Sequence, residues 1–249
     1  MPDKPVALVT GANKGIGLQI AKDLVAHGFA VLVGSRDFEQ GEAAAKSIGS
    51  DAHALQLDVT NQDSITAAAA RIRHEFGRLD VLVNNAGISH AGKPGPSLSE
   101  NAQSGLLTVA PLDDVRTVFE TNVFGVIAVT QALLPLLREA AAGRIVNVGS
   151  TAGSLTWNSE PTNPHRGMFG TYSASKTALH AVTLGFAFAL ESTGIKVNIA
   201  CPGFTATALN NFEGTRSVEQ GAREAVRLAL LGPDGPTGTF SDENGPVAW

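Results

Sequence analysis

The chain has 249 residues, of which 43% are hydrophobic and 16% are charged, so it is long and apolar enough to fold around a sizeable core. The formal net charge is -5 and the basic residues form no run, which excludes a nucleic-acid partner bound through its phosphates. We find no apolar stretch of about 18 residues and no signal-peptide pattern, so we expect no membrane partner. The single cysteine, Cys201, cannot form an internal disulfide, which fits a reducing compartment and predicts a cytoplasmic protein.

Short apolar runs alternate along the chain with longer amphipathic or Ala-rich stretches, a pattern typical of βαβ units around a parallel sheet. The runs are nearly continuously apolar, as in strands buried on both faces. The expected strands are Val6–Val9, Ala30–Val33, His53–Leu57, Val81–Asn84, Arg144–Val148, Lys196–Ala200 and Thr237–Phe240. The expected helices are Gly15–His27, Phe38–Ile48, Asn61–Phe76, Leu112–Ala140, Tyr172–Ser192 and Thr215–Leu231.

Two segments fit no regular element, Gly92–Leu107 and Ser154–Phe169, and each follows the end of a strand. Ligands of open parallel sheets bind outside the carboxyl ends of the strands. We therefore expect these two loops to form a lid or the walls of a substrate site.

A glycine-rich loop joins the first expected strand to the first expected helix. Glycines let the backbone approach a pyrophosphate, and the helix N-terminus supplies free N–H groups and a positive dipole. The residues that we expect to contact the cofactor here are Gly11, Asn13, Lys14, Gly15, Ile16 and Gly17. The spacing G-x-x-x-G-x-G differs from the familiar G-x-G-x-x-G, and an ordinary tight turn remains the alternative.

The end of the second expected strand indicates which nicotinamide cofactor binds. An NAD site usually presents a carboxylate there, whereas an NADP site presents arginine. This strand is followed by Ser35 and Arg36, and Lys14 lies in the nearby glycine loop. Two cations and a hydroxyl suit a 2′-phosphate, so we expect NADP(H); solvated surface charges are the alternative. Asp37 is the contrary sign, which we interpret as the start or cap of the next helix.

Tyr172 and Lys176 lie four positions apart at the start of an expected helix, so they share one helix face. Reduction of a carbonyl needs a proton donor, and a tyrosine with a pKa of about 10 exchanges protons poorly near neutrality. A neighbouring ammonium favours the phenolate, so we expect Lys176 to lower the pKa of Tyr172. Ser150 follows a strand end, where its hydroxyl can bond the substrate oxygen; an ordinary turn residue is the alternative. Asn122, a poor helix former in mid-helix, suggests a kink or a buried hydrogen bond, and a solvated side chain is the default alternative.

Together these motifs resemble the short-chain dehydrogenase/reductase family over nearly the whole chain. In family order they are the glycine loop, Asp58, Asn84-Asn85-Ala86-Gly87, Asn122, Ser150, Tyr172 with Lys176, and Pro202-Gly203. The segments Asn13–Gly17 and Ser35–Asp37 and the residue Trp249 are most similar to its carbonyl-reductase branch.

The resemblance implies one α/β domain over residues 1–249, a Rossmann-like, doubly wound sheet of seven parallel strands with helices on both faces. Residues to about 150 form the cofactor half and the rest the catalytic half. It implies a tetrad of Asn122, Ser150, Tyr172 and Lys176, in which Lys176 also holds the nicotinamide ribose and Asn122 positions a water in a proton relay. The other implied cofactor contacts are Asp58, Val59, Asn84, Asn85, Ala86, Gly87, Pro202, Gly203 and Thr205.

Apolar side chains in the loops predict a bulky apolar substrate, although they could instead pack the loops down. They are Trp157, Met168, Phe169, Phe204, Leu209 and Phe212. The six histidines form no metal-ligand cluster, so no metal is expected.

We therefore expect reversible NADPH-dependent reduction of a small-molecule ketone or aldehyde. A non-catalytic NADP-binding sensor is the alternative. A nucleotide-sugar epimerase is a weaker alternative, because too few residues follow Gly203 to form the extra C-terminal substrate lobe of such enzymes. Ser150 and Tyr172 are 22 positions apart, a spacing between that of typical members and that of the carbonyl-reductase branch, whose longer insertion favours monomers. The choice between homo-oligomer and monomer therefore stays open.

Overall fold

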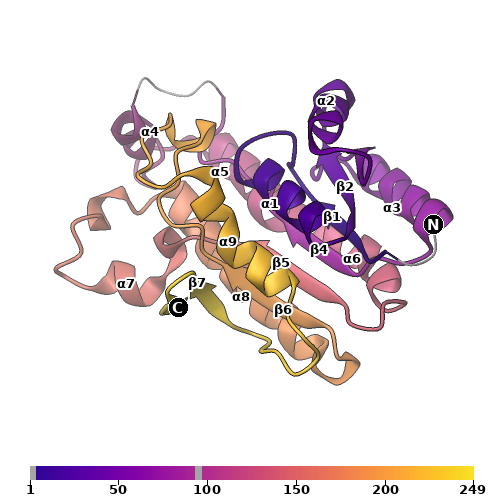
Figure 1. The fold of residues 1–249 in the computed structure, drawn as a ribbon. Coiled ribbons are helices and arrows are strands. Elements are labelled where there is room, and N and C mark those ends of the chain that lie inside the picture. Colours follow the sequence, from indigo (N-terminus) through magenta and orange to yellow (C-terminus); the bar gives the residue numbers. More distant parts are fainter. Residues whose placement is uncertain (1–3, 93–96) are drawn as a thin grey trace.

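A computed structural model describes residues 4–92 and 97–249 of the chain. Among these residues one sheet runs through the molecule in the order β3-β2-β1-β4-β5-β6-β7-β8 (Figure 1). Every neighbouring pair is parallel except β7 and β8, which form an antiparallel hairpin. The strands are β1 (Val6–Val9), β2 (Ala30–Ser35), β3 (Ala52–Gln56), β4 (Val81–Asn84), β5 (Arg144–Val148), β6 (Lys196–Ala200), β7 (Phe240–Asp242) and β8 (Gly245–Pro246).

The predicted doubly wound parallel sheet is confirmed, with one strand more than the seven expected. The seventh strand occupies Phe240–Asp242 rather than Thr237–Phe240, and the additional strand, Gly245–Pro246, follows it directly. Asp242 accepts a hydrogen bond from the backbone N–H of Asn244 at 2.8 Å, which closes the turn between them. A two-residue strand that contains a proline gives too little pattern to be recognised in the sequence.

Helices cover both faces of the sheet. They are α1 (Gly15–Ala26), α2 (Phe38–Ile48), α3 (Gln62–Phe76), α4 (Leu98–Ser104), α5 (Leu112–Phe119), α6 (Gly125–Leu137), α7 (Leu155–Ser159), α8 (Thr171–Ala189) and α9 (Val218–Ala229). Short 3-10 turns also occur at η2 (Thr151–Gly153), η3 (Arg166–Met168), η4 (Glu191–Thr193) and η5 (Ala208–Asn210).

Successive side chains of each strand point to opposite faces, and both faces are apolar. On β1, Ala7 and Val9 pack into the core beneath α1, α2 and α9, whereas Val6 and Leu8 pack into the core beneath α3, α6 and α8. Figure 1 shows α1 and α9 on the near side of the sheet. The two cores hold the carboxyl ends of β1, β2, β4, β5 and β6 at one edge, where the loops that carry polar residues begin.

The predicted helix Leu112–Ala140 is interrupted. A π-turn, η1 (Glu120–Phe124), separates α5 from α6 and contains Asn122, so the helix is irregular at the position where a kink was predicted. By length and composition alone, Leu112–Leu137 is also apolar enough to cross a membrane, which the sequence analysis did not anticipate. Its Val129, Leu133 and Leu136 are buried in the core of the sheet, and this packing accounts for the apolar composition.

The two segments expected to lack regular structure contain short helices. Helix α4 lies within Gly92–Leu107, of which residues 93–96 fall outside the described part of the chain. Helix α7 and the turn η3 lie within Ser154–Phe169. Side-chain caps start both helices, because Ser97 accepts from Glu100 N and Ser154 accepts from Trp157 N.

Candidate active site

Contacts with the loop after β4 hold the glycine loop between β1 and α1. Gly11 has a φ of 62°, and a Cβ placed on it would lie 3.0 Å from the Cα of Ala86. A Cβ on Gly17 would lie 2.6 Å from the oxygen of Gly11 and would also overlap the amide of Asn85. Asn85 Nδ2 donates to the carbonyls of Thr10 and Gly11 at 2.8 and 3.1 Å. The glycines are therefore required by close packing, and the N-terminus of α1 is left facing an open cleft.

That cleft has a volume of about 1100 Å³ and runs along the carboxyl edge of the sheet. The predicted cofactor residues that line it are Gly11, Asn13, Lys14, Gly15, Ile16, Gly17, Ser35, Arg36, Asp58, Val59, Asn85, Ala86 and Gly87. No acidic side chain lies in the first turn of α1, so nothing there opposes an anion at the helix N-terminus. The volume, the glycines and the free helix end fit a dinucleotide pyrophosphate.

The end of β2 presents cations rather than a free carboxylate to this cleft. Lys14 and Arg36 are exposed, and neither has an ion-pair or hydrogen-bond partner in the described part of the chain. Asp37 is the N-cap of α2, as predicted: its carboxylate accepts from Gln40 N at 3.1 Å and from Gln40 Nε2 at 2.9 Å. Ser35 is buried and its hydroxyl donates to the carbonyl of Asp37 at 2.7 Å. This leaves Lys14 and Arg36 as the available partners for a phosphate.

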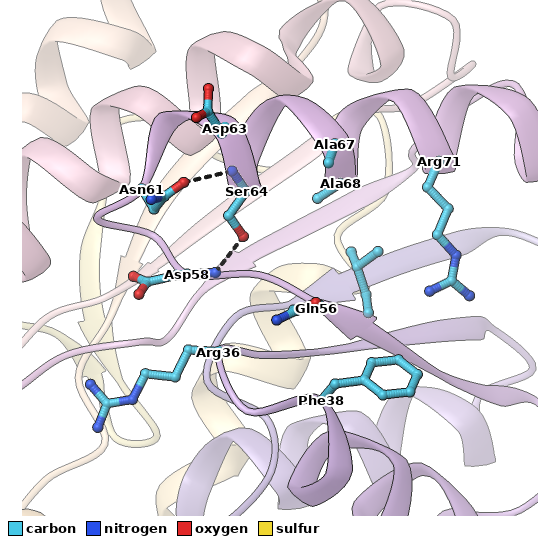
Figure 2. A pocket seen from close by; sticks show the side chains of 11 residues that line it. Arg36, Phe38, Gln56, Asp58, Asn61, Asp63, Ser64, Ala67, Ala68 and Arg71 are labelled. Atoms are coloured by element: carbon cyan, nitrogen blue, oxygen red, sulfur yellow. Dashed lines mark hydrogen bonds between the residues drawn. The ribbon is translucent and has the colours of Figure 1, made fainter.

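Arg36 and Asp58 also border a second, shallower cavity of about 650 Å³ between α3 and β3. Figure 2 shows these two side chains at one end of it and Arg71 at the other. Asp58 Oδ1 accepts from the backbone N and the hydroxyl of Thr60 at 2.9 and 2.7 Å, and Asp58 N donates to Ser64 Oγ at 2.9 Å. The Asp58 carboxylate is thereby held at the junction of the two cavities.

Tyr172 and Lys176 lie on one face of α8, with Lys176 Nζ 5.8 Å from the centre of the tyrosine ring. Burial raises the pKa of Tyr172 to about 12, against a smaller opposing effect of its hydrogen bond with Ser150. The expected lowering by Lys176 is therefore wrong for the protein without cofactor. Burial also lowers the pKa of Lys176 to about 8, and its ammonium donates to the carbonyl of Val148 at 2.7 Å. Near neutrality the phenol keeps its proton and remains a donor.

Ser150 lies directly beyond β5 and is the N-cap of η2, where its hydroxyl accepts from Ala152 N at 3.1 Å. Asn122 is fully buried in the π-turn. Its Oδ1 accepts from Ile88 N at 2.9 Å, and its Nδ2 donates to Ile88 O at 2.8 Å and to Ser175 Oγ at 3.0 Å. These bonds confirm the buried hydrogen-bond role expected of Asn122. They also occupy its amide, so its side chain has little capacity left to hold a relay water.

Gly87 connects the tetrad to the cleft. It lines the cleft, and a Cβ placed on it would lie 3.2 Å from Asn122 Oδ1 and 3.7 Å from Lys176 Nζ. Asn122 and Lys176 therefore meet next to Gly87, at the side of the cleft where a nicotinamide would lie if the pyrophosphate occupied the glycine loop.

Several implied cofactor residues point elsewhere. Asn84 is buried and donates to Thr130 Oγ1 and Asn147 Oδ1 at 3.1 and 2.8 Å, so it ties β4 to α6 and β5 instead of lining the cleft. Thr205 is buried and donates to the carbonyl of Pro202 at 2.9 Å. Pro202, Gly203 and Thr205 lie in the loop after β6 but do not line the cleft. The cleft wall comes from the next part of that loop, Ala206–Leu209 and Phe212.

The sequence analysis named Leu209 and Phe212 of this wall but missed Thr207 and the groups that hold the wall. Thr207 lies opposite Gly15, a Cβ on which would be 3.6 Å from Thr207 Cγ2. Its only signal is a second threonine two positions after Thr205. Ser175 and Ser89 were missed as well, because a serine whose partner lies far away in the chain, such as the Asn122 side chain or the Leu209 carbonyl, has no local signature.

Of the apolar residues expected around a substrate, some line the cleft and others do not. Leu209 and Phe212 line the cleft, and Phe212 is 69% exposed. Trp157, Met168, Phe169 and Phe204 lie outside the lining of the two cavities. Trp157 packs against His165 with ring centres 5.9 Å apart, so part of the loop packs on itself.

An α/β sheet with a glycine loop at its edge and a Tyr–Lys pair beside the cleft defines a nicotinamide-dependent oxidoreductase. The family model described as short chain dehydrogenase matches residues 5–217. The chain therefore belongs to the short-chain dehydrogenase/reductase family of enzymes, as the motifs predicted.

Individual relatives match along most of their length. The chain is 37% identical over 239 residues to the Short-chain dehydrogenase anuI of Penicillium roqueforti (strain FM164), covering 92% of this chain and 90% of the relative. It is 30% identical to a (+)-neomenthol dehydrogenase of Capsicum annuum, with 94% of each chain covered.

Solved structures agree with the fold. Salutaridine reductase from Papaver somniferum superposes with a TM-score of 0.80 at 29% identity, over 95% of this chain and 99% of that chain. A gluconate 5-dehydrogenase from Burkholderia cenocepacia J2315 in complex with NADP and tartrate has a TM-score of 0.78 at 26% identity, over 96% of this chain and 93% of that chain. A 3-ketoacyl-(acyl-carrier-protein) reductase from Brucella melitensis complexed with NADH has a TM-score of 0.79 at 28% identity, with 96% of each chain covered.

Proposed function

We propose that this protein reduces a ketone or aldehyde to the alcohol, reversibly, with NADPH as the hydride donor and Tyr172 as the proton donor. The observation that carries the proposal is that Tyr172, Lys176 and Asn122 lie together next to Gly87, which lines a cleft that fits a dinucleotide. The names of two similar proteins, salutaridine reductase and (+)-neomenthol dehydrogenase, support a carbonyl or alcohol as the reacting group.

The side chains divide the work at the reacting carbonyl. NADPH supplies the hydride when it is bound. Tyr172, whose high pKa keeps it protonated, donates its proton to the carbonyl oxygen, and Ser150 hydrogen-bonds the same oxygen. Lys176 holds its ammonium beside the tyrosine and, at the ribose, orients the cofactor. Asn122 fixes the loop at Ile88, which keeps Gly87 against the lysine.

The choice of NADPH over NADH rests on the end of β2. In the described part of the chain the side chains of Lys14 and Arg36 are unpaired cations beside the cleft. The nearby carboxylates are engaged, because Asp37 is held by Gln40 at the N-terminus of α2 and Asp58 by Thr60. Charge-assisted hydrogen bonds are worth about 1.5–3 kcal/mol. Losing Arg36 should therefore cost roughly ten- to a hundred-fold in NADPH affinity. NADH binding should hardly change, because NADH lacks the 2′-phosphate.

The coenzyme experiment compares kcat/KM for NADPH and NADH in the wild type and in Arg36→Ala. We expect a wild-type preference for NADPH that the variant largely loses. A wild-type preference for NADH, or an equal loss of kcat/KM with both coenzymes in the variant, would show that Lys14 and Arg36 do not bind the 2′-phosphate. Ser35→Asp is a less suitable variant here, because a Cβ on Gly41 would lie 3.0 Å from Ser35 Cβ and the site is crowded.

The substrate is proposed to be bulky and apolar. Leu209 and Phe212 on the cleft wall support this, and Phe204 and Trp157 are 44% and 40% exposed on neighbouring loops. The test follows the loss of NADPH with a panel of aryl ketones, alkyl aldehydes and small polar carbonyls. Much better turnover of the small polar carbonyls would contradict this substrate class while leaving the reaction type intact.

A non-catalytic sensor of NADP is the second candidate. It predicts tight NADPH binding and no consumption of NADPH with any carbonyl of the panel. Turnover that is abolished by Tyr172→Phe would exclude it.

A further inference from the structure

Trp249 connects the loop that contains α7 with an aromatic cluster of His180 and Phe240, which we call the floor of the catalytic site. Its carbonyl oxygen accepts a hydrogen bond from the backbone N–H of Thr156 at 2.7 Å. Thr156 lies in the first turn of α7, the short helix that also carries Trp157. Figure 1 shows the chain after β7 ending beside α7. This bond therefore links two segments that are far apart in the sequence.

The indole ring of Trp249 belongs to an aromatic cluster with Phe240 and His180. Its centre lies 5.7 Å from the ring of Phe240 and 6.1 Å from that of His180, which it meets edge-on. His180 and Phe240 are themselves 4.4 Å apart and are almost completely buried. Edge-to-face and tilted ring pairs at these separations are favourable beyond simple burial. The ring therefore fixes the position of the Trp249 carbonyl.

The cluster lies directly beneath the tetrad. His180 follows Lys176 by one turn of α8, as Lys176 follows Tyr172. A Cβ placed on Gly149 would be 2.9 Å from His180 Nε2 and would also overlap Ile199. Gly149 stands between Val148, whose carbonyl accepts from Lys176, and Ser150. The cluster thus packs against the backbone that positions two tetrad residues.

We propose that Trp249 is a positioning residue that holds α7 against this floor and so sets the affinity of the site for its carbonyl substrate. The proposal rests on the proposed function, because it needs a carbonyl substrate bound at Ser150 and Tyr172. Helix α7 is tied to the turn after Ser150, since Asn158 Nδ2 donates to the carbonyls of Thr151 and Ala152 at 3.3 and 3.0 Å. Trp249 touches neither Tyr172 nor Lys176 directly, so it should act on substrate binding rather than on proton transfer.

The kinetic test compares Trp249→Phe, Trp249→Ala and a matched control, Val247→Ala. Val247 packs on the same cluster but its backbone bonds to Phe240 instead of α7. Trp249→Ala keeps the main-chain oxygen but removes the ring that fixes its position. For the best aryl ketone of the panel, we expect this weakened anchor to raise KM up to about tenfold, the worth of one hydrogen bond, with little change in kcat. Trp249→Phe keeps an aromatic ring and should restore most of the affinity. Val247→Ala should behave like the wild type.

A second measurement needs no activity. The chain has two tryptophans, so each Trp249 variant leaves Trp157 as the only one, and its fluorescence reports on α7. Quenching of Trp157 by acrylamide should increase clearly in Trp249→Ala relative to Trp249→Phe. Circular dichroism verifies that each variant folds, and Trp249→Leu replaces the alanine variant if that one does not.

Two outcomes would overturn the proposal: equal quenching in all folded variants, or the same rise in KM for Val247→Ala as for Trp249→Ala. A fall in kcat without a change in KM would also contradict it. If the wild type reduces no carbonyl, the proposed function fails, yet the quenching comparison still decides whether Trp249 anchors α7.

Discussion

Tyr172 is the only tyrosine in the chain and the only proton donor that we assign to the carbonyl oxygen. Tyr172→Phe keeps the ring, and with it the packing beside Lys176, but removes the hydroxyl. We expect kcat to fall about 10³-fold, within the usual contribution of general acid catalysis. NADPH affinity, measured by fluorescence titration, should stay close to that of the wild type. Turnover near the wild-type rate would exclude Tyr172 as the acid.

His180 is a buried histidine whose two ring nitrogens have no hydrogen-bond partner in the described structure. Burial, reinforced by the charge of Lys176, lowers the pKa of His180 to about 4. In the unfolded chain the pKa is about 6.5. Between these two values the unfolded state binds the proton and the folded state does not. The free energy of unfolding therefore falls as the pH falls from about 6.5 toward 4.

His180→Phe should remove this dependence while keeping an aromatic ring against Phe240. Between about pH 7 and about pH 5, the wild type should lose about 2 kcal/mol of unfolding free energy more than the variant. Urea unfolding at both pH values measures the difference. Parallel losses in the two proteins would mean that His180 takes up its proton in the folded state.

For single residues, the sequence predicts roles that depend on neighbours a few positions away in the chain. The capping role of Asp37 and the pairing of Tyr172 with Lys176 follow from spacing along one helix. The sequence does not predict the pKa of Tyr172, because that depends on burial by segments far away in the chain. The structural role of the Asn84 side chain was not predicted for a similar reason, since its partners Thr130 and Asn147 come from other elements.

At the scale of elements, the loop between β6 and α9 forms one wall of the cleft and is fastened across it. Ser89 Oγ donates to the carbonyl of Leu209 at 2.9 Å, which joins the loop after β4 to the loop after β6. Leu209 lines the cleft, so this bond helps to fix the position of the wall. Phe212 in the same loop has a φ of 62°, a conformation that a bulky residue adopts only under constraint.

Ser89→Ala should loosen this wall. Since one net hydrogen bond is worth about 0.5–1.5 kcal/mol, we expect the dissociation rate of NADPH to rise roughly 2- to 10-fold in stopped-flow displacement. Ser47→Ala is the matched control, because the Ser47 hydroxyl bonds only to Ala44 within α2. An unchanged dissociation rate in Ser89→Ala would show that the wall opens independently of this bond.

The longer elements could be predicted, because the spacing of their apolar residues and their capping residues lie within the element itself. For α2 and for β4 to β6 the predicted and observed bounds agree. The shorter ones could not. Helix α7 has five residues, and its position depends on the carbonyl of Trp249. The π-turn at Asn122 was predicted only as a kink, because its type depends on bonds to Ile88 and Ser175.

At the scale of the whole molecule, parallel strands bring loops from distant parts of the chain to one edge of the sheet. The glycine loop after β1, the cations after β2 and the tetrad residues after β5 meet there although each motif is separate in the sequence. Cofactor binding at this edge should therefore stabilise the entire fold, because the unfolded chain has no such edge.

This gives a test of the cofactor on the whole protein without turnover. NADPH at about 100 times its Kd should add about 2.7 kcal/mol, which raises Tm by roughly 5–10 °C for a chain of this size. At the same concentration NADH should raise Tm less. In Arg36→Ala the NADPH shift should fall to about 1–5 °C, close to that of NADH, because the variant binds NADPH ten- to a hundred-fold more weakly.

Arg71→Ala is the matched control for lost positive charge. Arg71 lines the neighbouring cavity in Figure 2 and pairs with Glu75 at 2.9 Å, away from the lining of the cofactor cleft. Its removal can lower the starting Tm, yet the shift produced by NADPH should equal that of the wild type. Differential scanning fluorimetry of the three proteins with each coenzyme provides the comparison. Equal shifts by NADPH and NADH in the wild type would contradict the assignment of Lys14 and Arg36 to the 2′-phosphate, because those cations can distinguish the coenzymes only through that group.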